Sequence, residues 1–433
     1  MRAQGGLNVR IALFSYEYPP ETAAGGIATC THHTARMMAG CGHEVEVFAG
    51  SFVRSNRSTT EGVTVNRIRH DNHETFSVAA APVFTERHAA ARFDLMESPE
   101  LLAEAAAAFN HAPEVARVVK IHSPNTLLHT STHGQYHPPS FFDRVRLHLD
   151  ALSQGEKPYW AGSGQPAPMT EHHRFIETME REIACQADAV ITPSVHLGQF
   201  ISDSWQIPSD KLHHVPNVFM PSPAMLGIPT DSRTHRVTYI GRLEPLKGVF
   251  DLARAIPIIR KQFPSTRFRL IGESQYSDIF GDLGQYLRKT LLRRDMDVIE
   301  IPGPVPAEQI ISSLNETEIC VLPSILDNFP YACLEAMAAG RGVIGTVETG
   351  MAEMIEDGVS GKLVPKFSPQ AISEAVCHWL AHPDLRQEAG IAARERVCNA
   401  YSPSVLGPMQ EQAYTQALVR REQRLVNSST AVK

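Results

Sequence analysis

Long apolar runs are missing from this sequence, and no stretch approaches the ~20 residues that a transmembrane helix needs. A surplus of positive charge is missing too: 40 Lys and Arg residues stand against 47 Asp and Glu residues, a formal net charge of −7. Proteins that bind nucleic acid by their phosphates usually carry such a surplus. We therefore expect neither a membrane-spanning protein nor a nucleic-acid partner.

Motifs for disulfide or metal binding are also lacking. The seven cysteines are scattered between Cys30 and Cys398 without a C-x-x-C pair, which fits buried thiols in a reducing compartment. No H-E-x-x-H or zinc-type Cys/His spacing occurs, so the twenty histidines are better explained as solvated surface residues than as metal ligands. The short apolar run 11–14 is soon followed by Glu17, which predicts a buried first strand rather than a signal peptide. We expect a cytoplasmic protein.

The sequence has the length and composition of an ordinary globular protein with two domains: it has 433 residues, of which 43% are hydrophobic. Short apolar strands alternate with helical patterns through both halves, which predicts an α/β protein with two helix-covered parallel sheets. The segment 51–91 is expected to hold a strand and turns. The insertion 130–170 could serve acceptor recognition, face lipid or be an inert loop, and its sequence does not decide among these. The expected organisation is a first domain over 1–220, a Pro-, Gly- and Ser-rich linker over 221–235, a second domain over 236–400, a terminal helix over 401–426, and disorder after 426.

The chain is organised around the stretch 319–340, ICVLPSILDNFPYACLEAMAAG, which predicts a strand, a loop and a helix. Pro330 suits the first helical position, and Gly340 is placed to end the helix. Asp327 in the loop and Glu335 in the helix are separated by seven residues. A helix N-terminus can hold an anion, and two carboxylates can accept the hydroxyls of its carrier, which is the chemistry of a sugar nucleotide. An acidic cap on an ordinary helix would explain this stretch equally well.

Further candidate groups follow predicted strands. Arg242 and Lys247 flank a tight turn after the strand 237–240, where two cations would neutralise a diphosphate; a solvated basic turn is the alternative. Gly25-Gly26 precedes a predicted helix and would let backbone N–H groups approach a phosphate, although such a pair is often an ordinary turn. His122 ends the strand 115–121, at the edge where open α/β sheets bind ligands, although a lone histidine there is often structural.

Taken together, these motifs resemble the family-four retaining glycosyltransferases, which have the GT-B fold. Their E-x7-E signature is present as Asp327 to Glu335, with Asp where the first Glu is usual and Pro330 where a Gly is usual. The run GRLEPLKG at 241–248 resembles their G-R-x-x-x-x-K-G motif, and ESPELLAE with VVKIHSP resembles the region of their cleft histidine. The resemblance covers about residues 9 to 420 and is weakest over 130–170.

The resemblance implies two Rossmann-like parallel-sheet domains and a glycosyltransferase that moves a sugar from a nucleotide-diphosphate sugar to a saccharide or other hydroxyl acceptor, with retention of configuration. Arg242 and Lys247 would hold the diphosphate, Asp327 would lie against the sugar, and His122 would lie between sugar and acceptor; these four are the expected catalytic residues. No nucleophile, metal or other cofactor is expected. The expected donor-binding residues are Gly25, Gly26, Arg242, Lys247, Asn328, Phe329, Glu335 at the ribose, and Gly350 and Met351 through backbone N–H groups.

Two other functions stay open at this point. One is a sugar-nucleotide epimerase or hydrolase on the same fold, and the other is a sugar-nucleotide-binding protein without catalysis. The expected partners are the nucleotide sugar and a saccharide or glycoconjugate acceptor. A weak peripheral association with a membrane surface is compatible with the sequence but has no basic or apolar segment to support it.

Overall fold

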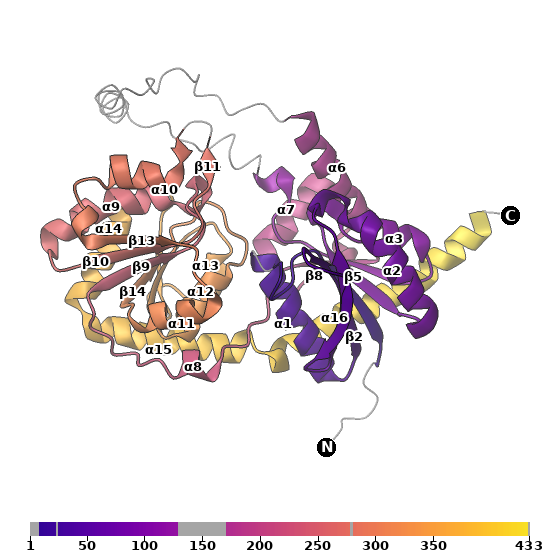
Figure 1. The fold of residues 1–433 in the computed structure, drawn as a ribbon. Coiled ribbons are helices and arrows are strands. Elements are labelled where there is room, and N and C mark those ends of the chain that lie inside the picture. The colour runs from indigo at the N-terminus through magenta and orange to yellow at the C-terminus, as the bar shows by residue number, and fades with distance from the viewer. Residues whose placement is uncertain (1–7, 23–24, 129–169, 278–279, 432–433) are drawn as a thin grey trace. The chain divides into compact units, whose positions relative to one another are not determined.

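The computed structural model describes residues 8–22, 25–128, 170–277 and 280–431 (Figure 1). The described chain forms two compact units, each built around its own sheet. The first unit comprises the described residues up to Leu127, those from 170 to Met220, and those from Asn399 onward. The second unit comprises Pro221–Cys398 and, of the described residues before them, Leu128. The α/β class with parallel sheets, as predicted from the alternation of strands and helices, is confirmed.

The first unit contains an eight-stranded sheet in the order β3-β4-β2-β1-β5-β6-β7-β8, parallel throughout except that β3 runs antiparallel to β4. Its strands are β1 Arg10–Ser15, β2 Glu44–Ser51, β3 Asn56–Thr60, β4 Val63–Arg69, β5 Leu95–Pro99, β6 Ala116–Lys120, β7 Ala189–Thr192 and β8 Leu212–His214. Its α-helices are α1 Gly26–Cys41, α2 Phe76–Ala91, α3 Ala106–His111, α6 Glu171–Gln186, α7 Val195–Trp205 and α16 Pro403–Ala431, with 3-10 turns η1 His73–Thr75, η2 Leu101–Ala103 and η4 Ser209–Lys211.

Strand β1 sits at the centre of this sheet and is apolar on both faces, as a parallel strand between two helical layers must be. Ile11 pairs with Val45 of β2 on one side and with Leu95 of β5 on the other, and all three side chains are buried. The chain therefore moves outward from β1 in one direction through β2 and in the other through β5. The carboxyl ends of β1 and β5 form a switch point, where open α/β sheets bind ligands.

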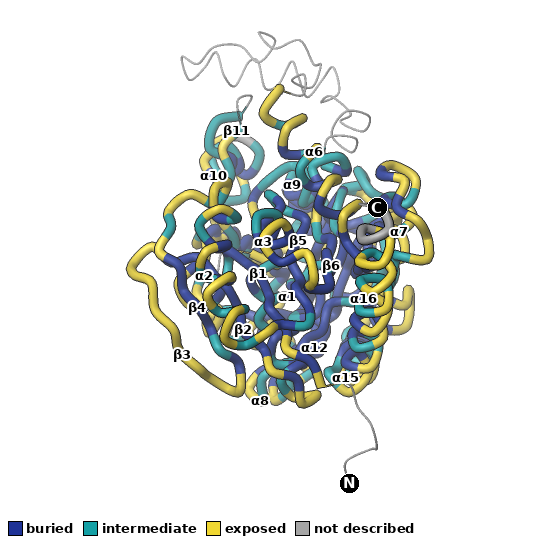
Figure 2. Tube along the Cα trace, turned by 90° about the vertical axis from the view of Figure 1, so that its right-hand side faces the viewer, coloured by how far each residue is buried: buried dark blue, intermediate teal, exposed yellow. Residues whose placement is uncertain are grey.

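Helix α16 packs on β5, β6 and β7 of the first unit, although it follows the second unit in sequence. Two of its fully buried side chains, Gln410 and Tyr414, donate to the carboxylate of Glu97 on β5 at 2.7 and 2.8 Å. Figure 2 shows strands β1, β5 and β6 of this unit as buried, whereas the edge strand β3 and the outward faces of the covering helices are exposed. The core of the first unit is therefore completed by the last helix of the chain.

The second unit contains a six-stranded, fully parallel sheet in the order β13-β10-β9-β14-β15-β16. The order reverses between β9 and β14, which places a second switch point there. The strands are β9 Arg236–Ile240, β10 Arg267–Ile271, β13 Ile299–Gly303, β14 Ile319–Val321, β15 Gly342–Thr346 and β16 Lys362–Val364, with a small hairpin of β11 Tyr276–Ser277 and β12 Gly281–Asp282. The helices are α8 Pro223–Leu226, α9 Val249–Gln262, α10 Leu283–Tyr286, α11 Ala307–Asn315, α12 Tyr331–Ala338, α13 Met351–Met354, α14 Pro369–Ala381 and α15 Pro383–Ala400, with short turns η5 Pro245–Lys247, η6 Leu287–Leu291 and η7 Met296–Val298.

Three local expectations differ from the structure. Residues 76–91, expected as turns, form helix α2, in which Pro82 is tolerated because the carbonyl left without a helical donor belongs to Val78, which is 70% exposed. Pro330 caps α12 from an extended conformation and does not occupy its first turn. Helix α16 continues to Ala431, beyond the expected onset of disorder. The expected insertion 130–170 lies almost entirely outside the described residues.

Three arginines, of which Arg341 and Arg386 are buried and Arg394 is partly buried, hold the start of the second unit, a segment expected to be a linker. Arg341 donates to the carbonyl of Pro229, Arg386 to that of Ser232 at 2.6 Å, and Arg394 to that of Ile228 at 2.6 Å. Residues 228–232 are therefore fixed to the second unit by side-chain hydrogen bonds.

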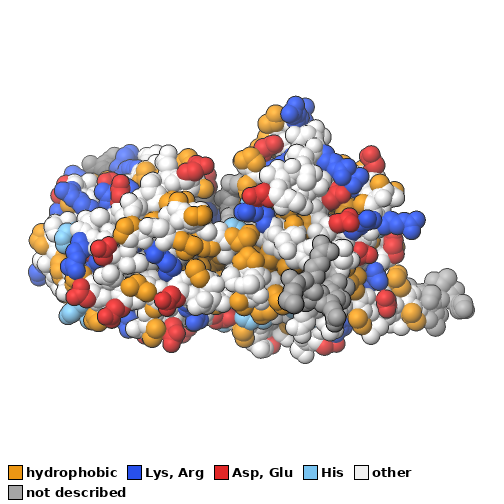
Figure 3. Space-filling model, turned by 90° about the horizontal axis from the view of Figure 1, so that it is seen from below, with side chains coloured by type: hydrophobic (Ala, Val, Ile, Leu, Met, Phe, Trp, Pro, Cys, Tyr) orange, Lys and Arg blue, Asp and Glu red, His pale blue; other side chains and the backbone are white. Residues whose placement is uncertain are grey.

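The surface carries charges of both signs. On the face shown in Figure 3, acidic and basic side chains are interspersed among polar and apolar ones. No helix among the described residues is long and apolar enough to cross a membrane.

Candidate active site

In the second unit, two of the predicted catalytic residues form an ion pair at the switch point. The ammonium of Lys247, in the turn after β9, donates to Oδ2 of Asp327 at 2.7 Å, and the hydroxyl of Ser324 donates to the same oxygen at 3.2 Å. Asp327 and Ser324 both lie in the loop between β14 and α12. The Lys247 and Asp327 side chains are 23% and 13% exposed, so the pair is accessible from solvent on one side.

Close backbone contacts fix this loop in place. The N–H of Gly350 donates to the carbonyl of Asp327 at 2.8 Å, and a Cβ at Gly350 would lie only 1.5 Å from the carbonyl oxygen of Asn328. On the other side, a Cβ at Gly248 would lie 1.8 Å from the carbonyl oxygen of Pro323, and Gly248 has a left-handed φ of +67°. Only glycine allows the three loops to approach so closely. The loops after β9, β14 and β15 therefore form one interlocked platform.

Arg242 lies on the same edge of the sheet, directly after β9. Its guanidinium is 56% exposed and pairs with Glu244 at 2.9 Å, while its carbonyl accepts the hydroxyl of Tyr239 at 2.6 Å. The backbone of this turn is fixed from within, whereas the charged end of the side chain extends toward solvent. Both predicted diphosphate ligands thus carry a carboxylate partner in this structure, and an incoming anion would have to replace these partners.

Glu335 projects from α12, and its side-chain carboxyl makes no hydrogen bond or ion pair among the described residues, although its backbone carbonyl accepts the N–H of Ala339 at 2.9 Å. Burial raises the pKa of its carboxyl to about 7, because no neighbouring donor compensates for the lost hydration. A partly buried carboxyl without a partner is suited to accept hydroxyl groups of a ligand. This matches the ribose-binding role that the resemblance implies.

The other predicted donor-binding residues of this unit have mostly structural contacts. Asn328 and Phe329 are each 5% exposed. The N–H of Met351, at the start of α13, donates to the hydroxyl of Thr349 at 3.2 Å, and that of Gly350 is used by Asp327 as described above. In this structure both N–H groups therefore already have partners.

In the first unit, the Gly25-Gly26 pair begins α1. Gly25 occupies the cap position in an extended conformation, and no described side chain caps the first turn. A Cβ at Gly25 would lie 3.3 Å from a carboxylate oxygen of Glu17. The close carboxylate shows that this helix N-terminus has an acidic neighbour, which a bound phosphate would have to tolerate.

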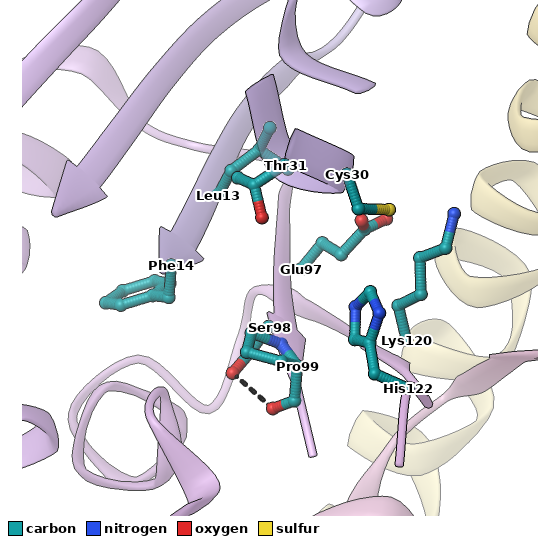
Figure 4. A pocket seen from close by; sticks show the side chains of 9 residues that line it. All are labelled: Leu13, Phe14, Cys30, Thr31, Glu97, Ser98, Pro99, Lys120 and His122. Carbon is teal, nitrogen blue, oxygen red and sulfur yellow. Dashed lines mark hydrogen bonds between the residues drawn. The ribbon is translucent and has the colours of Figure 1, made fainter. Parts of the chain in front are cut away.

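His122 follows β6 and lines a small polar cavity (Figure 4). In Figure 4 its imidazole lies beside the side chain of Lys120. Burial, followed by the charge of Lys120, lowers the pKa of His122 to about 3, so the imidazole is neutral near pH 7. The cavity is lined by Leu13, Phe14, Cys30, Thr31, Glu97, Ser98, Pro99, Lys120 and His122. These residues come from β1, β5, β6, α1 and the loop after β6, so the cavity lies at the switch point of the first sheet.

Sequence reasoning missed several residues of these sites. The sequence pattern assigns no role to Ser324, although its hydroxyl donates to Asp327. Glu100 was noted only as part of a family-like pattern, although its carboxylate binds the backbone of His122. The available signal for Glu100 was a charged residue directly after an apolar strand end, at the edge of the sheet where ligands bind.

Comparison with known proteins agrees with this arrangement. A family model described as "Glycosyl transferase 4-like domain" matches residues 25–218, and one described as "Glycosyl transferases group 1" matches residues 227–396. The two models meet close to the division between the units and together span most of the chain. The chain is a family-four-type glycosyltransferase with the GT-B fold.

Individual relatives extend over nearly the whole glycosyltransferase. Glycogen synthase of Mycobacterium tuberculosis is 25% identical over 429 residues, covering 94% of this chain and 95% of that protein. Sucrose-phosphate synthase of Thermosynechococcus elongatus has a similar fold, with a TM-score of 0.69, 21% identity, and coverage of 95% and 100%. The catalytic domain of starch synthase IV of Arabidopsis thaliana, solved with ADP and acarbose, gives a TM-score of 0.68 at 13% identity and covers 95% and 100%. Both units of the chain therefore have counterparts in known glycosyltransferases, and the structural likenesses support the GT-B fold.

Proposed function

We propose that this glycosyltransferase moves a hexose from a nucleoside-diphosphate hexose to a saccharide acceptor, with retention of configuration and without a metal ion. The observation that carries the proposal is the pair of Lys247 and Asp327 at 2.7 Å, with Arg242 on the same edge of the sheet. The family relationship supports the reaction class. The names of the relatives, a glycogen synthase among them, support a hexose and a saccharide.

The charges suggest how the donor is activated. When the bond between sugar and diphosphate breaks, negative charge develops on the diphosphate, and the cations of Arg242 and Lys247 would stabilise it in place of a metal. Loss of one such preorganised donor typically costs about 3 kcal/mol in the barrier, or a hundredfold in rate. In this scheme Lys247 turns from Asp327 to the diphosphate, and the released carboxylate accepts a hydroxyl of the sugar.

The remaining roles are assigned by chemistry. Glu335 would accept the ribose hydroxyls. His122 would lie between the sugar and the acceptor and would hydrogen-bond to them. Its imidazole is neutral near pH 7 and would add no charge there. Departure of the diphosphate and attack of the acceptor hydroxyl on the same face of the sugar, with the hydroxyl proton passing to the departing phosphate oxygen, would retain the configuration, and no enzyme nucleophile is assigned.

The first test is thermal unfolding of the purified chain against UDP, ADP, GDP and their glucose or mannose sugars, with and without EDTA. A ligand at a hundred times its dissociation constant should stabilise the protein by about 2.7 kcal/mol. One nucleotide should stand out, and EDTA should not change its effect. Stabilisation that requires a divalent metal would overturn the metal-free scheme, and no stabilisation by any nucleotide would overturn the donor site.

The second test is turnover of the stabilising nucleotide sugar, with maltose and glucose as acceptors and NMR of the product's anomeric proton. We expect Arg242→Ala to lose about a hundredfold in rate. Arg233→Ala is the matched control, because Arg233 is similarly exposed at 59% and pairs with the exposed Asp384 on the surface. Turnover that proceeds equally without acceptor would favour a hydrolase, and an inverted product would contradict retention.

A further inference from the structure

Three buried glutamates bind the backbone of loops at the carboxyl edge of the first sheet. Glu104 accepts the N–H of Tyr16 after β1 at 2.8 Å. Glu180 on α6 accepts the N–H of Asn125 at 2.8 Å and its side-chain amide at 2.7 Å. Glu100, after β5, accepts N–H groups of the loop that follows β6. The glutamates are 1%, 0% and 1% exposed, respectively, so each carboxyl group contacts protein rather than water.

Glu100 makes the most concentrated of these contacts. Its two carboxylate oxygens both lie 2.9 Å from the backbone nitrogen of His122, and one of them also accepts the N–H of Ser123 at 2.7 Å. Hydrogen bonds of N–H groups to a carboxylate are stronger and shorter than those to a neutral acceptor. The backbone that carries the imidazole of His122 is therefore held from the residue's own amide nitrogen.

A buried carboxylate that accepts two backbone N–H groups loses more hydration free energy than a neutral acceptor would. Burial raises the pKa of Glu100 to about 7 despite these hydrogen bonds, and Glu104 adds a like charge. Burial raises the pKa of Glu180 to about 8, with Glu100 as a repulsive neighbour. A backbone carbonyl or a serine hydroxyl would satisfy the same N–H groups at a lower cost of desolvation. Stability alone therefore does not explain the choice of residue.

The backbone next to Glu100 is strained as well. Leu102 and Ala103 in the turn η2 have left-handed φ values of 52° and 50°, a region that residues with a Cβ rarely adopt. Such strain persists where surrounding structure imposes it, and it is concentrated at functional sites. Here helix α6, which carries Glu180, packs directly on η2. A strained turn thus presents a buried carboxylate to the loop of His122.

We propose that Glu100 is a positioning residue for transfer: through the N–H groups of His122 and Ser123 it fixes where the imidazole meets the sugar and the acceptor. The inference rests on the proposed function in so far as His122 contacts the reacting groups. Glu100 itself contacts neither substrate. Displacement of a catalytic group by about 1 Å can cost about a hundredfold in rate, which sets the size of the expected effect.

The contact itself can be tested without any activity. Hydrogen–deuterium exchange of a peptide covering 118–127 should accelerate at least tenfold in Glu100→Ala and less in Glu100→Gln, which retains one carbonyl acceptor. Exchange in a peptide covering β1 should not change by this amount. Unchanged exchange at 118–127 in both variants would overturn the positioning role, whether or not the protein is a transferase.

The link to catalysis is tested by a double-mutant cycle with the best donor sugar and maltose. We expect Glu100→Gln to lower kcat about tenfold to a hundredfold with little change in the donor KM, and to have almost no further effect in a His122→Ala background. Glu46→Gln is the matched control, since Glu46 is also buried and hydrogen-bonded, to Asn66 and Arg87, but lies on β2. Its effect should be the same with and without His122.

The outcomes separate the two proposals. If the wild-type protein transfers no sugar but exchange at 118–127 responds to Glu100, the proposed function fails while the contact stands. If the wild-type protein is active and the effects of Glu100→Gln and His122→Ala simply multiply, the positioning role is wrong and the proposed function is untouched.

Discussion

The ammonium of Lys247 and the carboxylate of Asp327 lie 2.7 Å apart, although the two residues are separated by 80 positions in the chain. The pair joins the turn after β9 to the loop before α12. The pair places a cation and an anion side by side at the switch point of the second sheet, where each could bind a different part of one ligand.

Replacing the cation tests this pair directly. Lys247→Met keeps the length of the side chain but removes the charge, and we expect kcat to fall about a hundredfold because the departing diphosphate loses a preorganised donor. Steady-state rates of nucleoside diphosphate release would measure the loss. Lys362→Met is the control, since Lys362 pairs with Asp357 at 3.3 Å on the surface of the same unit. Equal rates for both variants would contradict the role of Lys247.

The glycine platform predicts a stability effect. In Gly350→Ala the new Cβ would meet the carbonyl oxygen of Asn328 at 1.5 Å, so the loops must separate. We expect a loss of about 2 kcal/mol, or roughly 5 °C in Tm, together with loss of nucleotide binding. Calorimetry with and without nucleotide would measure both. Gly40→Ala should instead be neutral or stabilising, because nothing lies within 4 Å of a Cβ there and the residue is in helix α1.

Glu335 should distinguish ribose from deoxyribose. If its carboxyl, which has no partner in the described part of the chain, accepts the ribose hydroxyls, Glu335→Ala should weaken binding of the ribonucleoside diphosphate about tenfold, the value of one charge-assisted hydrogen bond. Binding of the 2′,3′-dideoxy analogue, measured by titration calorimetry, should change much less. Equal weakening of both ligands would place Glu335 elsewhere than at the ribose.

The buried glutamates make stability depend on pH. Burial raises the pKa of Glu100 to about 7 and that of Glu180 to about 8, from 4.5. At pH values between the ordinary pKa and these raised pKa values, the folded protein binds more protons than the unfolded chain. Its free energy of unfolding should therefore fall as the pH rises from 5 to 8. Urea denaturation at pH 5, 6.5 and 8 would measure the slope, and Glu180→Gln should flatten it.

The control for this slope is again Glu46. Burial would raise the pKa of its carboxyl, but hydrogen bonds from Arg87 and Asn66 outweigh burial and lower it. Glu46 is therefore ionised in both states above pH 5, and Glu46→Gln should reduce stability without changing the slope. A flattened slope in that variant, or an unchanged slope in Glu180→Gln, would show that other groups set the pH dependence.

Much of the fold could be predicted from the sequence because parallel sheets have a clear pattern. Buried strands such as 319–321 are continuous apolar runs, and helices with polar faces separate them. The sequence does not indicate helix α2, because Pro82 suggests a break. This proline is tolerated because Val78 is exposed to solvent, and that exposure is a property of the folded surface. Strand and helix patterns are local, whereas exposure depends on the whole fold.

The candidate site shows the same limit. Arg242, Lys247, Asp327 and Glu335 could be singled out because charged residues next to strand ends are unusual and because their spacing resembles a family motif. That Lys247 and Asp327 bind each other could not be predicted, since the contact depends on which strands are neighbours in the sheet. Glu100 was overlooked for the same reason: it follows β5, and its partner His122 follows β6.

The packing of α16 on the first sheet has a consequence for how the protein is made. Glu97 receives its hydrogen bonds from Gln410 and Tyr414, which are 313 and 317 positions further along the chain. At about 5–20 residues per second, a ribosome would add these partners on the order of 15–60 s after Glu97. The second unit, whose residues 221–398 are contiguous, can complete its core before α16 is synthesised. During that time the apolar face of β5, β6 and β7 that α16 covers stays exposed. The first sheet to be synthesised is the last to be finished, and chaperones would be needed most during that interval.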